Sequence, residues 1–396
     1  MAPKKPAKKS GNVSFNGPEG QEDMPYLLTP GPLTTSSSVK QAMLADWGSR
    51  DIEFRQLVAN IRNKLLHTAG VSQDKGYECV LMQGSGTFAI EAALASFCPG
   101  GRKKKTLVVI NGAYGHRAAK ILTHLKRPHV TLEFDEETPV NADKLATTLK
   151  DNSDISVVFV VHCETTTGVM NPLEDICKVC KDHGKTVYVD AMSSFGAIEA
   201  NMAELDIDIL VSSANKCIEG VPGFGYVLCR RDLLEASQGK SHSISLDLFD
   251  QWQAMEKTAQ FRFTPPTHAL VAFHQALAEH EDEGGTTARG KRYQKNCDTL
   301  LKGMRDQGFE TLLDDDIAGP IIQTFLSPAD PKFDFDTFYE ALRGHGFAIY
   351  PGKLTKRDSF RIGTIGKLDA NVFNRLLKAI TTVLRDMGVT SNSPSN

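Results

Sequence analysis

The residue that most suggests chemistry is a lysine at the end of an apolar stretch. In "DILVSSANKCIEGVPGFG", Lys216 follows an apolar run that closes in small polar residues, and glycine-rich sequence comes after it. A buried lysine is costly because burial disfavours its charged form. The same burial leaves more of the amine neutral at pH 7, which makes it a better nucleophile. Lys216 is therefore a candidate for amine chemistry, with a lysine paired to a buried carboxylate as the alternative.

A carboxylate stands in a comparable position earlier in the chain. Asp190 closes the almost wholly apolar run "TVYVD". An unpaired buried charge costs several kcal/mol, so this carboxylate needs a partner. Asp190 is therefore a candidate for pairing with a positively charged group of a ligand, and an aspartate with a purely structural partner is the alternative.

Polar groups also follow three further predicted strands. Gly84–Thr87, "GSGT", opens a predicted helix. Its glycines let the backbone approach an anion, and its hydroxyls and free N–H groups add donors. This predicts a phosphate cradle, with an ordinary turn as the alternative, because Gly-Ser-Gly is also common at turns. The segment is neither a Walker A sequence nor a GxGxxG fingerprint. Tyr114 offers an aromatic face past the next strand, or is an ordinary half-buried tyrosine. Glu164–Thr167 crowd polar groups at a third strand end, or form an ordinary polar loop.

These groups together match the needs of one cofactor. In open α/β sheets, ligands bind outside the carboxyl ends of the strands, where all of these residues are expected. Pyridoxal phosphate requires an amine for its aldehyde and a carboxylate for its ring nitrogen. It also requires a phosphate cradle and an aromatic face. Several successive strand ends that each carry a required group favour a pyridoxal phosphate site over chance.

The elements that must position these residues alternate between strand and helix. Apolar β-branched runs separated by helical patterns predict a mostly parallel central sheet with helices on both faces, an α/β fold. The expected strands are residues 77–83, 105–112, 156–163, 186–191, 207–214 and 224–230, and the expected helices are residues 86–98, 115–125 and 173–184.

After about Ala276 the pattern changes to that of a smaller α+β C-terminal domain. Its expected helices are residues 286–308, 335–346 and 369–388, and its expected strands are residues 320–328, 347–352 and 359–366. The predicted organisation is a disordered lysine-rich tail (1–23), a large domain with an N-terminal substrate segment (24–275), a small domain (276–390) and a loose end (391–396).

Composition excludes several other classes of protein. The chain has 396 residues and a formal net charge of −3, which gives no reason to expect a nucleic-acid partner. No apolar run is as long as a membrane span. The eight cysteines are scattered, which favours reduced thiols and a cytoplasmic location over a disulfide framework. Cys177 and Cys180 form a CxxC on a predicted amphipathic helix without a second ligand pair, so no metal site is predicted.

Four segments resemble the class V aminotransferases, which have the fold-type I architecture. They are "VDAMSSFGAI", "LVSSANKCIEGVPGFGYVL", "RFTPPTHA" and "FRIGTIG". The N-terminal "YLLTPGPLTTSSSVKQAMLADWGSRDIEF" and the segment "QGSGTFAIEAAL" are similar to the subgroup of 2-aminoethylphosphonate–pyruvate transaminases. The resemblance extends over residues 25–388 and leaves out only the two ends.

The resemblance implies cofactor-binding roles for individual residues. Lys216 matches the lysine that condenses with the aldehyde, and Asp190 matches the partner of the ring nitrogen. Tyr114 occupies the ring-stacking position, where relatives often have tryptophan. The phosphate loop is matched by Ser85, Gly86 and Thr87, and a hydroxyl near the phenolic oxygen by Thr165.

Other implied roles concern the substrate and a second subunit. Arg361, in "FRIG", matches the arginine that binds the acidic group of the substrate, and its planar fork suits a carboxylate or a phosphonate. Thr34 and Ser36, in "TPGPLTTS", are expected substrate contacts. Thr264, in "FRFTPPTH", matches a residue that reaches the phosphate of the neighbouring subunit, which implies a homodimer with shared active sites.

The implied activity is transfer of the amino group of 2-aminoethylphosphonate to pyruvate, a step in phosphonate catabolism. It yields phosphonoacetaldehyde and L-alanine. Three alternatives stay open: an alanine–glyoxylate or serine–pyruvate aminotransferase, a pyridoxal phosphate-dependent aminophosphonate lyase, and a catalytically silent scaffold of the same fold. The segment "DWGSRDIEF" favours the phosphonate enzyme, because many relatives have histidine near Trp47–Ser49.

Overall fold

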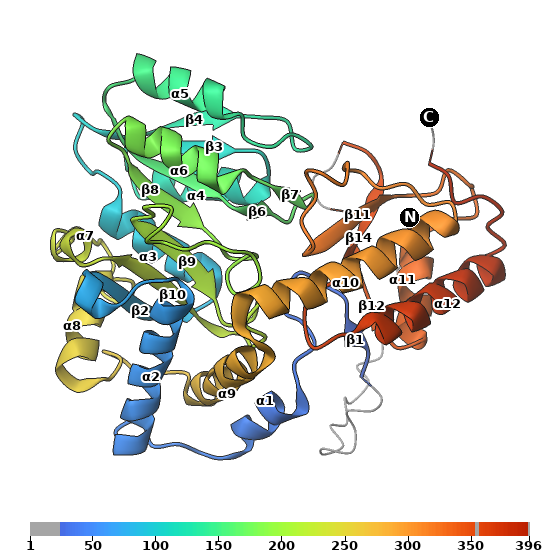
Figure 1. The fold of residues 1–396 in the computed structure, drawn as a ribbon, viewed down its shortest axis with the longest axis horizontal. Coiled ribbons are helices and arrows are strands. Elements are labelled where there is room, and N and C mark those ends of the chain that lie inside the picture. The colour runs from blue at the N-terminus through green and yellow to red at the C-terminus, as the bar shows by residue number, and fades with distance from the viewer. Residues whose placement is uncertain (1–23, 353–355, 395–396) are drawn as a thin grey trace, which may run out of the picture.

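The computed structural model describes residues 24–352 and 356–394, so the predicted lysine-rich tail lies outside the described residues. Figure 1 shows a large sheet with its helices on the left and a smaller C-terminal unit on the right, with a long helix, α10, running between them. Within the described part of the chain, no helix combines the length and the apolar character that crossing a bilayer demands.

The large sheet carries the predicted strand ends. Among the described residues it has seven strands, in the order β2-β10-β9-β8-β5-β3-β4. Strand β10 runs antiparallel to both of its neighbours, and the other pairings are parallel, which confirms the predicted mostly parallel sheet. The strands are Tyr77–Gly84 (β2), Lys105–Ile110 (β3), His129–Glu133 (β4), Ile155–Val161 (β5), Thr186–Asp190 (β8), Ile209–Ser213 (β9) and Gly223–Arg230 (β10).

Both faces of this sheet are apolar because its strands are apolar at nearly every position. Successive side chains point to opposite faces, so Val187 and Val189 join one core cluster and Tyr188 joins another. One face is covered by Ile52–Thr68 (α2), Ala142–Asp151 (α5), Leu173–Asp182 (α6) and Thr267–Glu283 (α9). The other face is covered by Gly86–Phe97 (α3), Ala113–His124 (α4), Arg231–Glu235 (α7) and Leu248–Thr258 (α8).

The C-terminal unit is built on a small antiparallel sheet of order β11-β14-β13. The predicted strand at residues 347–352 is divided into two short strands, the first of which pairs with the N-terminal segment. The elements are Gly285–Asp306 (α10), Ile322–Leu326 (β11), Phe335–Gly344 (α11), Phe347–Ala348 (β12), Tyr350–Pro351 (β13), Ser359–Gly363 (β14) and Ala370–Met387 (α12), with Tyr26–Leu27 (β1) beside β12. The remaining short elements are Ser37–Gln41 (α1), two 3-10 turns at Ala42–Leu44 and Gln73–Lys75, and the hairpin Cys163–Glu164 (β6) and Val169–Met170 (β7).

Strand β14 places a charged side chain by simple alternation. Phe360 and Ile362 point into an aromatic-rich core shared with α11 and α12. Arg361, between them, must therefore point to the opposite face of the strand. That face looks toward the large sheet, because Arg361 reaches the loop that follows β5.

We propose that the chain divides into a large and a small domain. The predicted boundary at residues 275 and 276 falls inside α9, whose buried residues pack on the large sheet. At the other end, the segment predicted to be loose includes Ser393, whose carbonyl accepts a hydrogen bond from the Ala329 N–H at 2.9 Å.

Candidate active site

One pocket at the carboxyl ends of the strands collects most of the predicted residues. It is lined by Ser85, Gly86, Thr87, Tyr114, Asp190 and Lys216, together with Ile90, Arg117, Ala118, Met192, Ser213 and Asn215. These residues come from the ends of β2, β8 and β9 and from the first turns of α3 and α4. The carboxyl edge of an open α/β sheet is where such sites are expected.

The wall formed by the start of α3 is suited to a phosphate group. Ser85 is the N-cap residue, and its side chain makes no capping hydrogen bond, so the hydroxyl and the first N–H groups of α3 are available to an anion. A Cβ atom at Gly86 would meet the sulfur of Met192, so any larger residue would have to displace that side chain from the pocket wall. Arg117 Nη1 donates to Thr87 Oγ1 at 3.2 Å, which adds a positive charge to the cradle.

A buried carboxylate fixes the aromatic wall. Glu164 Oε2 accepts from the Tyr114 N–H at 3.1 Å, and Thr166 Oγ1 accepts from the Ala113 N–H at 2.9 Å. The polar cluster after β5 therefore caps α4, where a carboxylate also favours the helix dipole. The Arg117 guanidinium carbon lies 4.9 Å from the centre of the Tyr114 ring. The Tyr114 ring is therefore oriented by the bond of its backbone to Glu164 and by the contact with Arg117.

Asp190 is a buried carboxylate that forms no ion pair among the described residues. It is 4% exposed, and its Oδ1 accepts the Met192 N–H at 2.9 Å. Burial raises the pKa of Asp190 to about 7, and the hydrogen bond from Met192 only partly opposes this. A positively charged ring nitrogen placed against Asp190 would remove this penalty.

Lys216 reaches back to the N-terminal segment of the chain. Its Nζ donates to the carbonyl of Pro30 at 2.6 Å. Burial lowers the pKa of Lys216 from the ordinary lysine value. A Cβ atom at Gly31, where φ is +115°, would lie 2.8 Å from Lys216 Nζ, so glycine is required for the segment to pass this close.

Arg361 and Thr165 meet beside this pocket. Arg361 is 4% exposed, and its Nη1 donates to the Thr165 carbonyl at 2.7 Å, while Nε donates to the Pro351 carbonyl at 3.0 Å. Burial lowers the pKa of Arg361. The Thr165 hydroxyl is buried and has no hydrogen-bond partner within the described part of the chain. An anion at Arg361 and a polar ligand atom at Thr165 would satisfy both groups.

Three predicted residues lie elsewhere or are already engaged. Thr264 lines a separate hollow with Ser49, Arg50 and residues 260–265, and of the residues described none lines both hollows. The Thr34 hydroxyl accepts from the Leu27 N–H at 2.8 Å. The Ser36 hydroxyl caps α1 and donates to Glu279 at 2.8 Å. In this conformation, Thr34 and Ser36 use their side chains for structural contacts.

Sequence reasoning did not single out Arg117 and Met192, which line the pocket, or the Pro30 carbonyl, which accepts from Lys216. Arg117 stands one turn after Tyr114 on α4, and the helical spacing of "YGHR" was the available signal. Met192 follows the end of β8 by two residues, where strand alternation no longer predicts the direction of a side chain. The Pro30 carbonyl carried no signal, because a backbone oxygen gives no sequence pattern.

The residues of the pocket, together with Thr165 beside it, fit pyridoxal phosphate at each of its functional groups. The start of α3 would hold the phosphate, Tyr114 would face the ring, and Asp190 would pair with the ring nitrogen. Lys216 would meet the aldehyde, and the unpartnered Thr165 hydroxyl would meet the ring oxygen. The donor set therefore matches the charges and polar atoms of this cofactor.

Comparisons with known proteins agree on one family. A sequence signature described as "Aminotransferase class-V" matches residues 38–333. The 2-aminoethylphosphonate–pyruvate transaminase of Rhizobium meliloti is 50% identical over 93% of this chain and 96% of its own length. The enzyme of the same name from Pseudomonas aeruginosa is 49% identical over 93% of this chain and 98% of its own. Among solved structures, an alanine–glyoxylate aminotransferase from Nostoc sp. shares the fold, with a TM-score of 0.84 and 22% identity over 94% of this chain and all of its own.

The raised pKa of Asp190 predicts a pH signature in the cofactor-free protein. The folded protein keeps a proton on Asp190 up to about pH 7, and the unfolded chain releases it near pH 4. The stability that this group contributes is present below pH 4 and is lost as the pH rises through 7. Between pH 5 and pH 8, wild type should lose about 2–3 kcal/mol more unfolding free energy than Asp190→Asn.

The measurement is urea unfolding of the cofactor-free proteins at several pH values. Asp182→Asn, which alters an exposed ion pair with Lys178, serves as the matched control and should follow the wild-type pH profile. Parallel profiles for wild type and Asp190→Asn would contradict the assignment of a costly buried carboxylate.

Proposed function

The chain belongs to the class V aminotransferase family, and we propose that it transfers the amino group of 2-aminoethylphosphonate to pyruvate. The products are phosphonoacetaldehyde and L-alanine. Support comes from curated relatives of about 50% identity that carry this name and match nearly the whole chain. The single structural observation that carries the proposal is Arg361, a buried guanidinium that occurs in no ion pair among the described residues. A buried cation without a carboxylate is costly unless an anionic ligand pairs with it.

The family's cofactor is pyridoxal phosphate, which when bound supplies an aldehyde for amine exchange and a ring that accepts an electron pair. Asp190 would hold the proton on the ring nitrogen at the floor of the pocket. Arg117 and the start of α3 would neutralise the phosphate charge. Tyr114 would keep the ring in one plane, because Glu164 fixes its backbone.

Lys216 is the residue we propose to move the proton. Its lowered pKa keeps part of the amine neutral, so Nζ can accept a proton from the carbon next to the donor nitrogen. The protonated amine can then donate that proton to a different carbon, because its lowered pKa makes the proton easy to release. The Pro30 carbonyl, 2.6 Å from Nζ, orients the amine between transfers.

Arg361 is the residue we propose to hold the acidic group of each substrate. Its planar fork would donate hydrogen bonds to a phosphonate in one half-reaction and to the pyruvate carboxylate in the other. The Thr165 and Pro351 carbonyls already fix the plane of the guanidinium. Because its position is set before the substrate arrives, the ordering cost of binding is reduced.

The donor profile tests the proposal against the related aminotransferases. We expect alanine to form from 2-aminoethylphosphonate and pyruvate with a higher kcat/KM than from L-serine with pyruvate, and L-alanine with glyoxylate should be a poor pair. Arg361→Lys should raise KM for the donor by about 10–100-fold, because lysine lacks the bidentate fork. Arg385→Lys, at an exposed pair with Asp386, is the matched control and should leave KM unchanged.

Absence of alanine from 2-aminoethylphosphonate and pyruvate would contradict the proposal. Continued release of ammonia without any keto acid, beyond one equivalent per active site, would instead identify a lyase, because a transaminase stops after one half-reaction. A colourless protein that takes up no pyridoxal phosphate would identify a silent scaffold of the same fold.

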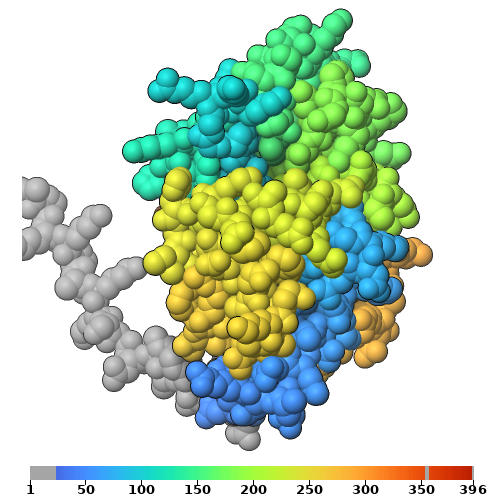
Figure 2. Space-filling view, turned by 90° about the vertical axis from the view of Figure 1, so that its left-hand side faces the viewer, coloured from blue at the N-terminus to red at the C-terminus, as the bar shows by residue number. Residues whose placement is uncertain are grey.

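We also propose a homodimer in which each subunit completes the site of the other. Large apolar side chains are exposed at Phe88, beside the phosphate cradle, and at Ile244 and Phe263, which are 50%, 75% and 52% exposed. Figure 2 shows the segment after β10, in yellow, spread across one face of the molecule. A second copy that packs against these side chains would bury them and, in this proposal, bring its Thr264 toward the cradle.

Mixing two inactive variants tests shared sites. Lys216→Ala and Thr264→Asp should each be poorly active alone. Coexpressed, they should recover about a quarter of wild-type activity, because half of the dimers then hold one intact site. Thr147→Asp, at an exposed threonine on α5, is the control and should remain active unmixed. A mixture no more active than Thr264→Asp alone would contradict shared sites.

We propose a cytoplasmic location for this enzyme. All eight cysteines are free and buried, as expected in a reducing compartment. Burial raises the pKa of Cys217, the neighbour of Lys216, to about 12, so that thiol stays protonated beside the reactive amine.

A further inference from the structure

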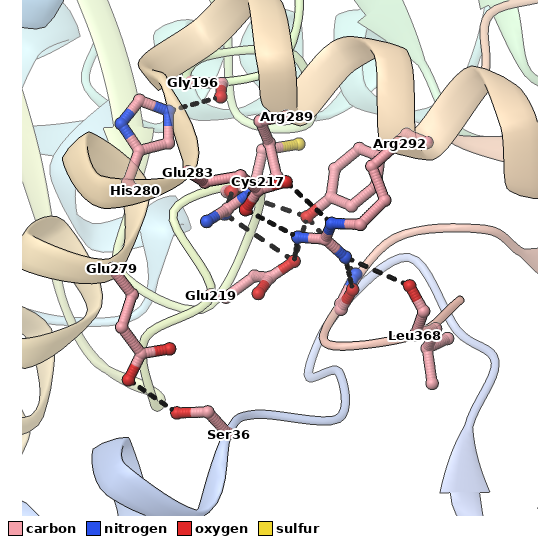
Figure 3. A network of polar contacts seen from close by, with 12 residues as sticks. Ser36, Gly196, Cys217, Glu219, Glu279, His280, Glu283, Arg289, Arg292 and Leu368 are labelled. Carbon is pink, nitrogen blue, oxygen red and sulfur yellow. Dashed lines mark hydrogen bonds and ion pairs between the residues drawn. The ribbon is translucent and has the colours of Figure 1, made fainter.

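Behind Lys216 lies a buried cluster of charged side chains, shown in Figure 3. Glu219 is 3% exposed and Arg289 is 1% exposed. Arg292 Nη2 lies 2.8 Å from Glu219 Oε1, and Arg292 Nε lies 2.7 Å from Glu283 Oε1. Arg289 Nε completes the cluster at 2.8 Å from Glu283 Oε2. Two carboxylates and two guanidinium groups balance one another, so the cluster does not require an outside ion.

The cluster holds the backbone on the far side of Lys216. The Lys216 carbonyl accepts from the Glu219 N–H at 2.7 Å, which closes a single turn. Glu219 has φ of +64°, a left-handed conformation that persists in a non-glycine residue only when its surroundings enforce it. Tyr293 supplies that enforcement by donating its hydroxyl to Glu219 Oε1 at 2.6 Å. Arg289 Nη1 donates to the Cys217 carbonyl at 2.5 Å.

The same side chains hold the segment that follows the Arg361 strand. Arg292 Nη1 donates to the Gly366 carbonyl at 2.6 Å and to the Leu368 carbonyl at 3.2 Å. The Gly366 N–H donates to the Tyr293 hydroxyl at 3.2 Å. Gly366 follows β14 by only three residues. Arg292 and Tyr293 therefore each contact both the Lys216 turn and the end of the strand that carries Arg361.

We propose that Arg292 and Tyr293 are positioning residues that set the separation between the Lys216 amine and the Arg361 guanidinium. This inference rests on the proposed function, in which Arg361 binds the acidic end of the donor and Lys216 acts at its amino end. The donor must span the two groups, so their separation selects donors by length. A misplacement of about 1 Å is enough to slow such a reaction by about 10²-fold.

The proposed role is one of geometry, because Arg292 and Tyr293 contact the two segments through hydrogen bonds to Glu219 and to backbone groups near Gly366. A variant that keeps the charge at position 292 but changes its shape should therefore reveal the positioning role.

Arg292→Lys is that variant, because lysine keeps the charge but cannot span Glu219 and Gly366 at once. Hydrogen exchange of the pyridoxal phosphate-loaded protein, read by mass spectrometry, is the measurement. Exchange should become about tenfold faster in both residues 216–220 and residues 363–368, with the rest of the large sheet unchanged. In addition, kcat should fall by about 10²-fold, with less change in cofactor affinity. Arg305→Lys is the control, because Arg305 lies on the same helix as Arg292 and forms only an exposed pair with Asp315, and it should leave both segments unchanged.

Tyr293→Phe is a second variant that removes a single oxygen and keeps the ring in the core. It should accelerate exchange in the same two segments, by less than Arg292→Lys. For either variant, faster exchange in only one segment, or a uniform increase over the whole chain, would overturn the coupling. Exchange is read without substrate, so a failure of 2-aminoethylphosphonate as donor leaves this test intact, and unchanged exchange overturns the coupling even in an active transaminase.

Discussion

The desolvation of two ionisable groups at neighbouring strand ends is the constraint on which the site depends. Asp190 and Lys216 stand at the carboxyl ends of β8 and β9. Burial raises the pKa of Asp190 and lowers the pKa of Lys216, so it favours the neutral form of each group. For each group on its own, this burial is a cost. A ligand that brings a cationic nitrogen to Asp190 and an aldehyde to Lys216 removes both desolvation costs, and this relief contributes to its binding. The fold supplies the sheet edge that brings the two groups to one pocket.

The rest of the molecule supplies what these two strand ends cannot. The N-terminal segment crosses the pocket close enough for the Pro30 carbonyl to accept from Lys216. The C-terminal unit brings Arg361 to the loop after β5 through one hydrogen bond to Thr165. The buried cluster around Arg292 ties the segment that follows β14 to the Lys216 turn. Three segments distant in sequence thus meet at one reactive amine, which explains why residues far from the chemistry are expected to affect it.

How much the sequence could predict depends on the distance between the contacting residues. The parallel sheet and the residues at its strand ends were readable, because parallel strands bring their carboxyl ends to one edge and apolar runs mark the strands. Arg117 required the position of α4, and the pairing of Glu219 with Arg292 required knowledge that α10 lies behind the lysine turn. Thr34 and Ser36 were expected substrate contacts, and the structure shows their hydroxyls bonded within the protein. Neighbouring hydroxyls in a polar loop give no pattern that distinguishes a cap from a ligand contact.

The most direct test of the account is the chemical identity of the lysine that holds pyridoxal phosphate. Borohydride reduction of the loaded protein, followed by digestion and mass spectrometry, should place the cofactor mass on Lys216 alone, and Lys216→Ala should retain none. The mass on any other lysine, or equal labelling of Lys216→Ala, would contradict the central claim that this buried amine is the reactive group.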